Sequence, residues 1–506
     1  MSSSRGRLNR MRGGNHRNNL QPPRRDHIRQ RREVIQEIST TKRRLLKMIV
    51  AIPQPLGSTE NKSFKDFMKG LNPPVEIPTQ SVMRSLLVRV YSEIRNELQS
   101  SLKEPEDVVL TCESWSHRVK DSFLTVSCHF VDNHGNLKSY VLSTKYLLRD
   151  ESADNIIKQI SAVVKAWGLE GKVHAVVRAG LPQLKGVRTK WTDMPCFAET
   201  LNVVFQDLMS NDELSSVFKK CQDIVRFFKL DSEAEKKLRK IQKKLNMEQN
   251  ELKVSSGDNW LLWFNMLEGL TLQRVAIEMY FVQENKKDLI LDENETVKLE
   301  NITSVLKHLK KVTSMMNKEG FQSISVMLPL LTTLMDDLRE EEKRGNEVAK
   351  ILLSNCKKHI GNVNNHPLAF NTFLDPRYKD QLGEQNKNRV KNKIMQDLTP
   401  APEAPSTHNP DELLHSYTAY TPTSEKSNPL AWWRNTGKTK FGELSKLALK
   451  KLGVVSTAVP LERAFSTTGD HFCNQRSAIE PENLDMILFL NSNWPAMSQT
   501  QVCEPR

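Results

Sequence analysis

The chain has 506 residues, which is too long for one ordinary core and indicates two or more domains. Hydrophobic residues make up 38% of it, so generic disorder is excluded. The net charge of +14 is uneven, because residues 1–50 carry 14 Lys and Arg against three acidic residues. A focused basic segment is typical of proteins that bind nucleic acid or a nuclear-import receptor.

Membrane and secreted classes do not fit the sequence. The early apolar run at 45–52 is interrupted by Lys47 and is too short for a membrane span or a secretory leader. The seven cysteines are scattered without a Cys-x-x-Cys pair, which argues against a disulfide framework or a Cys-rich zinc site. No P-loop or Gly-rich dinucleotide motif occurs. We therefore expect a reducing compartment, no membrane partner, no bound metal and no cofactor.

Residues 1–44 are predicted to be a disordered basic arm. Gly13-Gly14 and Pro22-Pro23 break any helix there. The candidate residues for DNA binding or nuclear import are its clustered cations: Arg24, Arg25, Arg29, Arg31, Arg32, Lys42, Arg43 and Arg44. The alternative is a solvated tail with neither role.

A helical segment at 45–105, with its main helix over 80–103, is predicted to precede an α/β region at 106–195. Alternating or β-branched runs predict three meandering strands, then a helix, then a fourth strand: 107–112, 123–131, 137–142, 156–167 and 172–178. This is the opening order of an RNase H-like α/β fold.

The rest of the chain reads as mainly helical. Apolar stripes at helical spacing fill 196–398, which we interpret as an all-α insertion. A Pro/Thr/Ser-rich linker is predicted over 399–429, because six prolines fall within it. Compact structure resumes over 430–494, and 495–506 is a tail.

The C-terminal segment carries the most specific motifs. It contains Asn428-Pro429-Leu430-Ala431-Trp432-Trp433 and Leu461-Glu462-Arg463-Ala464-Phe465-Ser466. It closely resembles the C-terminal dimerisation region of hAT-superfamily transposases, whose hallmark is Ser-Glu-Arg-x-Phe-Ser. Upstream, Leu374-Asp375-Pro376-Arg377-Tyr378-Lys379 is similar to another family motif. The resemblance covers about residues 45–494 and is closest to the zinc-finger BED-domain-containing proteins.

The resemblance implies an RNase H-like core, split by the helical insertion and completed by the C-terminal region. Family members cleave and join DNA with two divalent metals held by Asp, Asp and Glu, since Mg²⁺ needs converging carboxylates. The matching positions here are Glu113, Ala179 and Glu462. Two of the three have changed, so we expect no intact catalytic site. As plain structural residues, Glu113 would be a strand-end carboxylate and Glu462 a helix residue paired with a cation.

Other family elements have also diverged. Arg178 adds a cation beside Ala179, and Gly180 stands where the family has Asn. Asp193 is the nearest downstream acid, fourteen residues beyond Ala179. The family's Cys-x-x-His element reads Cys196-x-x-Glu199, and its Trp motif survives only as Trp260 and Trp263. We also expect no BED finger, because the segment before the resemblance has no Cys and only two His.

The resemblance also implies a homodimer built on the C-terminal region. Pro481 and Glu482 suit a helix start, and the helix that follows is apolar on one face. The candidate dimerisation residues are Leu461, Phe465, Leu484, Ile487, Leu488 and Leu490. The alternative is that this face is buried on the core of its own chain.

These features favour a domesticated, catalytically inactive hAT transposase that acts in the nucleus as a dimeric DNA-binding or transcription-regulatory protein. Its expected partners are a second copy, DNA through the arm, and a nuclear-import receptor. Two alternatives stay open. One is a protein-interaction scaffold without DNA affinity, and the other is a residual transposase or nuclease with a rearranged site.

Overall fold

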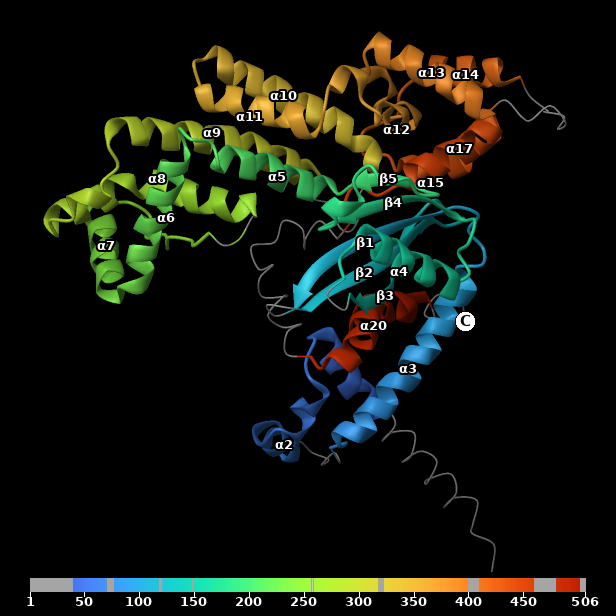
Figure 1. The fold of residues 1–506 in the computed structure, drawn as a ribbon, viewed down its shortest axis with the longest axis horizontal. Helices are drawn as coiled ribbons and strands as arrows, with labels where there is room; N and C mark the ends of the chain where they lie inside the picture. Colours follow the sequence, from blue (N-terminus) through green and yellow to red (C-terminus); the bar gives the residue numbers. More distant parts are fainter. Residues whose placement is uncertain are drawn as a thin grey trace, which may run out of the picture. The chain divides into compact units, whose positions relative to one another are not determined.

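The computed structural model describes residues 40–70, 77–117, 121–147, 150–255, 257, 259–316, 323–398, 409–458 and 479–500 (Figure 1). The chain divides into two compact units, one ending at Leu87 and the other beginning at Val88. Most of the predicted arm therefore lies outside the described residues. None of the described helices is both long and apolar enough to span a membrane.

The first unit is helical. It contains a helix over residues 40–51, the 3₁₀ turn η1 (Leu56–Glu60), α2 (Lys62–Lys69) and the first two turns of α3 (Gln80–Ser101). Leu45, Leu46, Ile49 and Val50 are buried and make one stripe of the first helix. The helix that this stripe stabilises includes Lys42, Arg43 and Arg44. The prediction that these three residues belong to a disordered arm is therefore wrong.

The second unit is built around a mixed five-stranded sheet with the strand order β3-β2-β1-β4-β5. Its strands are β1 (Val108–His117), β2 (Asp121–Val131), β3 (Leu137–Tyr146), β4 (Val173–Ala179) and β5 (Thr192–Pro195). The first three pair antiparallel, while β4 and β5 run parallel to β1. The helix α4 (Ala153–Ala166) connects β3 to β4 and packs on β2 and β3.

Four strands and the helix between them confirm the predicted order, because their period-two and helical patterns are strong. Leu124, Val126 and Cys128 alternate into the interior, and Ile156, Ile160 and Val163 form the buried stripe of α4. The strand β5 was not predicted. It has four residues and only Met194 as a large apolar side chain, so the pattern carries no signal.

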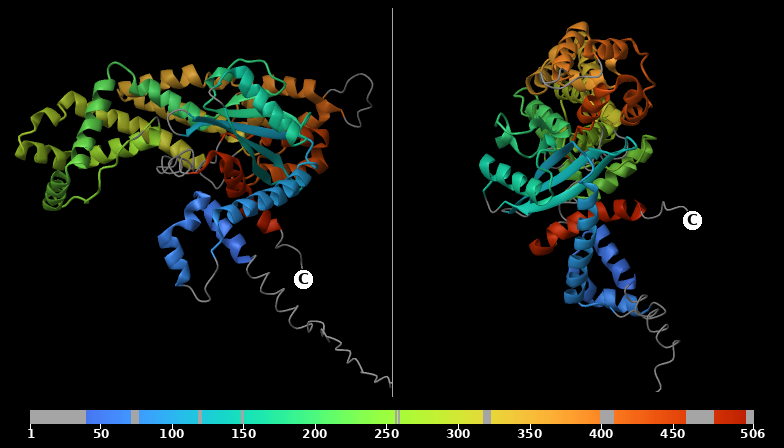
Figure 2. Two further views of the ribbon diagram at one scale, coloured as in Figure 1. Left: turned by 60° about the horizontal axis from the view of Figure 1, so that its bottom comes forward. Right: turned by 90° about the vertical axis from the view of Figure 1, so that its right-hand side faces the viewer.

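A large helical region follows the sheet and extends to one side of it (Figure 2). Its helices are α5 (Phe197–Met209), α6 (Ser215–Leu230), α7 (Ser232–Lys244), α8 (Trp260–Gln283), α9 (Glu293–Met316), α10 (Met327–Lys343), α11 (Glu347–His359), α12 (Ala369–Leu374) and α13 (Glu384–Leu398). One contiguous core runs through these helices and reaches Val109, Ala175 and Val177 of the sheet. The sheet and the helical region therefore share one hydrophobic core.

The predicted linker at 399–429 is not uniformly irregular. Residues 399–408 lie outside the described residues, but α14 (Pro410–Ala419) is a regular helix. The side chain of Asn409 accepts a hydrogen bond from the N–H of Asp411, and Pro410 occupies the first turn, where its missing N–H has no cost. Leu414 and Tyr417 bury this helix in the core. The sequence did not predict this capped helix, because the many prolines indicated a linker.

The C-terminal region comprises α15 (Pro429–Trp432), the π-helical turn η7 (Trp433–Gly437), α16 (Lys438–Phe441) and α17 (Glu443–Leu452). Its aromatic side chains pack together with those of α12 and α14. The ring centroids of Tyr417 and Trp433 are 5.0 Å apart, and those of Tyr417 and Phe441 are 5.5 Å apart. The indole N–H of Trp433 also donates to the carbonyl of Leu374 at 2.7 Å. The Trp433–Leu374 bond joins segments that are 59 residues apart in sequence.

The last helix, α20 (Pro481–Thr500), covers the edge strand β3 (Figure 1). The buried amide of Asn493 bonds both backbone groups of Val141: Val141 N–H donates to Oδ1 at 3.0 Å, and Nδ2 donates to the carbonyl at 2.7 Å. About two helical turns earlier in α20, the carboxylate of Asp485 accepts a hydrogen bond from the N–H of Thr144 at 2.6 Å. Side chains of α20 thus satisfy backbone groups that an edge strand otherwise leaves open.

A buried histidine links three strands of the sheet. His129 on β2 lies 3.0 Å (Nε2) from Thr111 Oγ1 on β1 and 2.8 Å (Nδ1) from Ser139 Oγ on β3. Its ring has no exposed surface, and this burial lowers its pKa to about 3. The imidazole is therefore neutral in the folded chain across the physiological range.

We expect acid to destabilise the fold through His129. An unfolded imidazole has a pKa of about 6.5, so as the pH falls the unfolded chain takes the proton first. The contribution of neutral His129 to the free energy of unfolding is complete above pH 6.5. It falls by about 1.4 kcal/mol per pH unit between about pH 6.5 and pH 3. Between pH 7.5 and 5, the free energy of unfolding of His129→Gln should therefore fall by about 2 kcal/mol less than that of the wild type, as measured by chemical denaturation. An unchanged acid dependence in His129→Gln would contradict this, and His134→Gln, in the exposed β2–β3 turn, is the control.

Candidate site at the ends of strands β1 and β4

Two of the three positions that match the family's catalytic carboxylates lie side by side. Glu113 of β1 and Ala179 of β4 are register partners in the parallel pair, at its last paired residues. Partners in parallel strands share a face of the sheet, so a carboxylate at 179 would stand beside Glu113. Ala179 offers only a methyl group there. The third position, Glu462, lies outside the described residues.

The neighbouring cation does not face this position. Adjacent residues of a strand point to opposite faces, so Arg178 points away from the face of Ala179. Its Nε donates to both carboxylate oxygens of Asp193, at 2.8 and 3.0 Å, and its NH1 donates to the carbonyl of Leu181. The expectation that Arg178 puts a cation beside the metal site is wrong, because its side chain points to the other face and β5 brings Asp193 close enough to pair with it.

The residue after Ala179 closes the strand end tightly. Gly180 has φ of +65°, and a Cβ there would lie 2.6 Å from the carbonyl oxygen of Ser114. Only glycine fits both restrictions. The family pattern places Asn at this position, so the approach of β4 to β1 here excludes the side chain that the pattern requires.

Glu199, which stands where the family has His, occupies the same strand end. Its Oε1 accepts the N–H of Gly180 at 3.0 Å from the first turn of α5. Partial burial raises the pKa of this carboxyl, although the Gly180 N–H and the Arg178 charge oppose that effect. The sequence motif identifies Glu199 but does not predict its position beside Gly180, because only the folded chain brings α5 to that residue.

Cys196 anchors the chain that leads toward Glu462. Its Sγ accepts the N–H of Ala458 at 3.3 Å, and the N–H of Phe197 donates to the carbonyl of Ser456 at 3.0 Å. Burial raises the pKa of the Cys196 thiol to about 11, so it stays protonated. The last residue described before Glu462 is therefore held at the start of α5, beside β5.

The remaining candidate residues have structural places. Trp260 and Trp263 are buried in the helical core, where Trp263 lies against Phe205 and Phe218. Among the residues that the structure describes, no three His, Cys, Asp or Glu side chains are grouped so as to hold a metal ion. Arg24, Arg25, Arg29, Arg31, Arg32, Leu461 and Phe465 lie outside the described residues.

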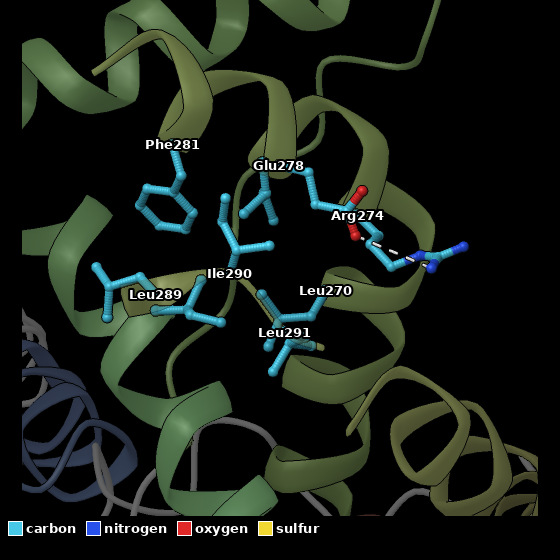
Figure 3. A pocket seen from close by; sticks show the side chains of 9 residues that line it. Leu270, Arg274, Glu278, Phe281, Leu289, Ile290 and Leu291 are labelled. Atoms are coloured by element: carbon cyan, nitrogen blue, oxygen red, sulfur yellow. Dashed lines mark ion pairs between the residues drawn. The ribbon is translucent and has the colours of Figure 1, made fainter. Parts of the chain in front are cut away.

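A small cavity in the helical region is apolar (Figure 3). It measures about 20 Å³, which is room for about one water molecule. Leu270, Phe281 and Ile290 line it, and the Arg274–Glu278 ion pair (3.9 Å) lies at its rim. We interpret this cavity as a packing defect between α6, α8 and the chain after α8.

The apolar face of α20 is covered within the chain. Its four candidate dimerisation residues are all buried: Leu484, Ile487, Leu488 and Leu490. Between them, Phe489 packs its ring 4.8 Å from Tyr91 and 6.0 Å from Trp167, centroid to centroid. The structure thus follows the alternative interpretation, in which this face packs on the chain's own core.

Three family descriptions match this chain. The ZBED1 RNase-like domain matches residues 111–180, the ZBED1 RNase-like helical domain matches 194–305, and the hAT family C-terminal dimerisation region matches 411–494. These matches support a ZBED-like protein related to hAT transposases. The first of these matches contains both Glu113 and Ala179, so the strand end described above lies within the region of family likeness.

Curated relatives extend the likeness along most of the chain. Zinc finger BED domain-containing protein 4 of Homo sapiens is 22% identical over 89% of this chain and 43% of its own length. Zinc finger BED domain-containing protein 6 of Homo sapiens is 18% identical over 90% of this chain and 50% of its own length. The putative AC transposase of Zea mays is 20% identical over 89% of this chain and 64% of its own length. This ZBED-like chain therefore spans about half the length of the human relatives.

We expect Leu488→Asp to destabilise the fold rather than release a folded monomer. The side chain is 7% exposed, and an unpaired buried charge costs several kcal/mol. The thermal unfolding midpoint should fall by several degrees or more. Asp485→Asn, on the same helix, is a milder control, since an amide oxygen can still accept from Thr144. A Leu488→Asp variant that is as stable as the wild type but smaller by light scattering would contradict this.

Proposed function

We propose that this chain is a nuclear, DNA-binding regulatory protein that dimerises and does not cut DNA. The observation that carries the absence of DNA cleavage is Ala179 as the register partner of Glu113. Two-metal cleavage needs carboxylates that converge on both ions, and a methyl group cannot ligate a metal. We also propose that the sheet is RNase H-like, on the support of its strand order and its parallel β1–β4 pair.

The surroundings of Ala179 also disfavour a rescued metal site. The nearest downstream acid, Asp193, is engaged by Arg178 on the opposite face. Glu199 is held by the Gly180 N–H, and the glycine leaves no room for the family's Asn. Even a displacement of about 1 Å in a catalytic group can cost roughly 10²-fold in rate. Losing a ligand outright is a larger change.

Purified protein should therefore show no Mg²⁺- or Mn²⁺-dependent nicking of supercoiled plasmid above a buffer control. The measurement is the fraction of nicked circles over time at several metal concentrations. Cleavage that disappears in both Glu113→Gln and Glu462→Gln, but persists in Glu482→Gln at the exposed start of α20, would contradict the proposal. That result would favour a residual nuclease with a rearranged site.

The proposed DNA contact rests on the N-terminal arginines. Residues 1–39 contain ten Arg against three acidic residues, and they precede the first described helix. Cations of this density bind phosphate and release counterions, which makes affinity salt-dependent. The relatives named for zinc-finger BED domains and the relative named as a putative transposase support a DNA-related role. The same cluster fits the expectation of a nuclear-import receptor.

Removing residues 1–39 while keeping the helix at 40–51 should weaken DNA binding and nuclear accumulation together. If six of the arginines meet phosphates, the slope of log affinity against log salt should fall by about 5. Fluorescence anisotropy on a duplex between roughly 50 and 200 mM salt measures this slope. A full-length variant with Arg24, Arg25, Arg29, Arg31 and Arg32 changed to Gln separates charge from length. An unchanged slope in both variants would favour a scaffold without this DNA contact.

The proposed dimer is supported by the hAT family C-terminal dimerisation region at 411–494. Because Leu484, Ile487, Leu488 and Leu490 are buried within the chain, the proposed interface uses other surfaces of that region. The residues after Ala458, which include the candidates Leu461 and Phe465, belong to the matched range. A dimer of this kind would double the phosphate contacts of one arm and so raise the apparent DNA affinity.

A further inference from the structure

A second concentration of positive charge lies in the folded C-terminal region. Residues 434–451 contain six Lys and Arg but a single acid, Glu443. Beyond residue 50 the chain as a whole is nearly balanced, with 60 Lys and Arg against 57 Asp and Glu. With a net charge of +5 over 18 residues, the segment is at least as dense in positive charge as residues 1–50, which carry +11. It forms most of η7, all of α16 and most of α17.

A shallow hollow of about 590 Å³ opens on this segment. It is lined by Arg434, Asn435, Thr436, Thr439 and Lys440. Each of these side chains carries a hydrogen-bond donor, two of them are cations, and none is a carboxylate. The Thr439 hydroxyl donates to the Asn435 carbonyl at 3.1 Å, and the remaining donors suit an oxyanion better than a cation or an apolar ligand.

The hollow is built on a rigid turn. Trp433, which begins the π-helical turn, is fully buried, and a Cβ at Gly437 would collide with its ring. The widened π turn is a geometry that recurs at functional sites. Arg434 is fixed as well, since its Nε and NH2 donate to the carbonyls of Asp132 and Val131 at 3.1 and 3.2 Å. The guanidinium is thus held in place before any ligand arrives.

The lysines of the segment fall into two classes. Lys446 and Lys450 are paired, with Glu443 at 3.0 Å and with Asp107 at 2.5 Å. Lys440, which lines the hollow, and Lys438, two residues before it, form no ion pair with any residue that the structure describes, and both are exposed. The Lys440 ammonium lies 4.7 Å from the Tyr420 ring centroid, a weak contact that leaves its charge available.

Cations also crowd together at the far end of α17. The ammonium groups of Lys451 and Lys393 lie 5.3 and 5.5 Å from the centroid of one ring, that of Phe370. Burial lowers the pKa of Lys451, and the charges of Lys393 and Lys450 lower it further, while Asp397 and Asp107 oppose them. An anion placed near this cluster would relieve the repulsion between like charges.

We propose that the hollow around Arg434 and Lys440 binds phosphates of a DNA backbone. The hollow is open and shallow, so it suits a phosphate presented on a large surface better than a small molecule that needs enclosure. The unpaired Lys438 beside it adds a further cation, as a run of backbone phosphates requires. This inference rests on the proposed DNA-binding function and adds a contact that does not involve the arm.

The test compares two double variants of the full-length chain that change the charge equally. Lys438→Gln with Lys440→Gln removes the unpaired cations, and Lys446→Gln with Lys343→Gln removes two lysines that are paired, with Glu443 and with Glu340. If two phosphates are lost, the first variant should reduce the slope of log affinity against log salt by about 1.8. Wild-type affinity should then fall about tenfold more than the variant's between roughly 50 and 200 mM salt. The second variant should stay close to the wild type.

A neutral variant separates hydrogen bonding from charge. Thr436→Val with Thr439→Val should weaken duplex binding several-fold without changing the salt slope, and circular dichroism melting checks that each variant is folded. Equal slopes in the two lysine variants would overturn the proposal. So would an acidic peptide of matched charge that binds as tightly as the duplex and is lost with the same lysines. A wild-type chain that binds no duplex even at low salt would instead overturn the proposed function itself.

Discussion

The side chain of Asp375 has no exposed surface and bonds Ser325, before α10, and Arg377, which reaches the segment before α15. Its oxygens accept from Arg377 at 2.9 and 2.7 Å and from Ser325 Oγ at 2.7 Å. Arg377 in turn donates to the carbonyl of Ser427, just before α15. Removing one partner of such a buried pair typically costs about 3–5 kcal/mol. The family motif around Asp375 therefore has a structural explanation that does not involve catalysis.

The same motif aligns the C-terminal region with the sheet. Lys379, which is almost fully buried, donates to the carbonyls of Tyr417 and Thr418 at the end of α14. From there the chain passes through α15 to α17 and reaches Ala458, whose N–H meets Cys196. Sheet, helical region and C-terminal region are thus one structure. A basic surface on η7 and α16 is consequently fixed relative to the strand end at Glu113.

Strong local patterns made the sheet predictable, whereas pairing between distant segments did not. The alternation in β2 and the stripe of α4 suffice to place the first four strands, and the motif matches suffice to place Glu113 beside Ala179. Nothing local shows that Asp193 pairs with Arg178, because β5 is four residues of mixed polarity. The same holds for α20. Its leucines predict an apolar face, but whether a second copy or β3 covers that face depends on Asn493 and Asp485, whose partners are about 350 residues away.

That separation has a consequence for how the protein is made. The edge strand β3 ends at Tyr146, and the helix that bonds its free backbone groups begins only at Pro481. At typical synthesis rates of roughly 5–20 residues per second, about 20 to 70 s pass between the two. During that interval the nascent chain presents an open strand edge on a sheet that is otherwise ready to form, which is a template for pairing with other chains. The protein should therefore depend on chaperones during translation more than its finished sheet suggests, in which α20 bonds the β3 edge.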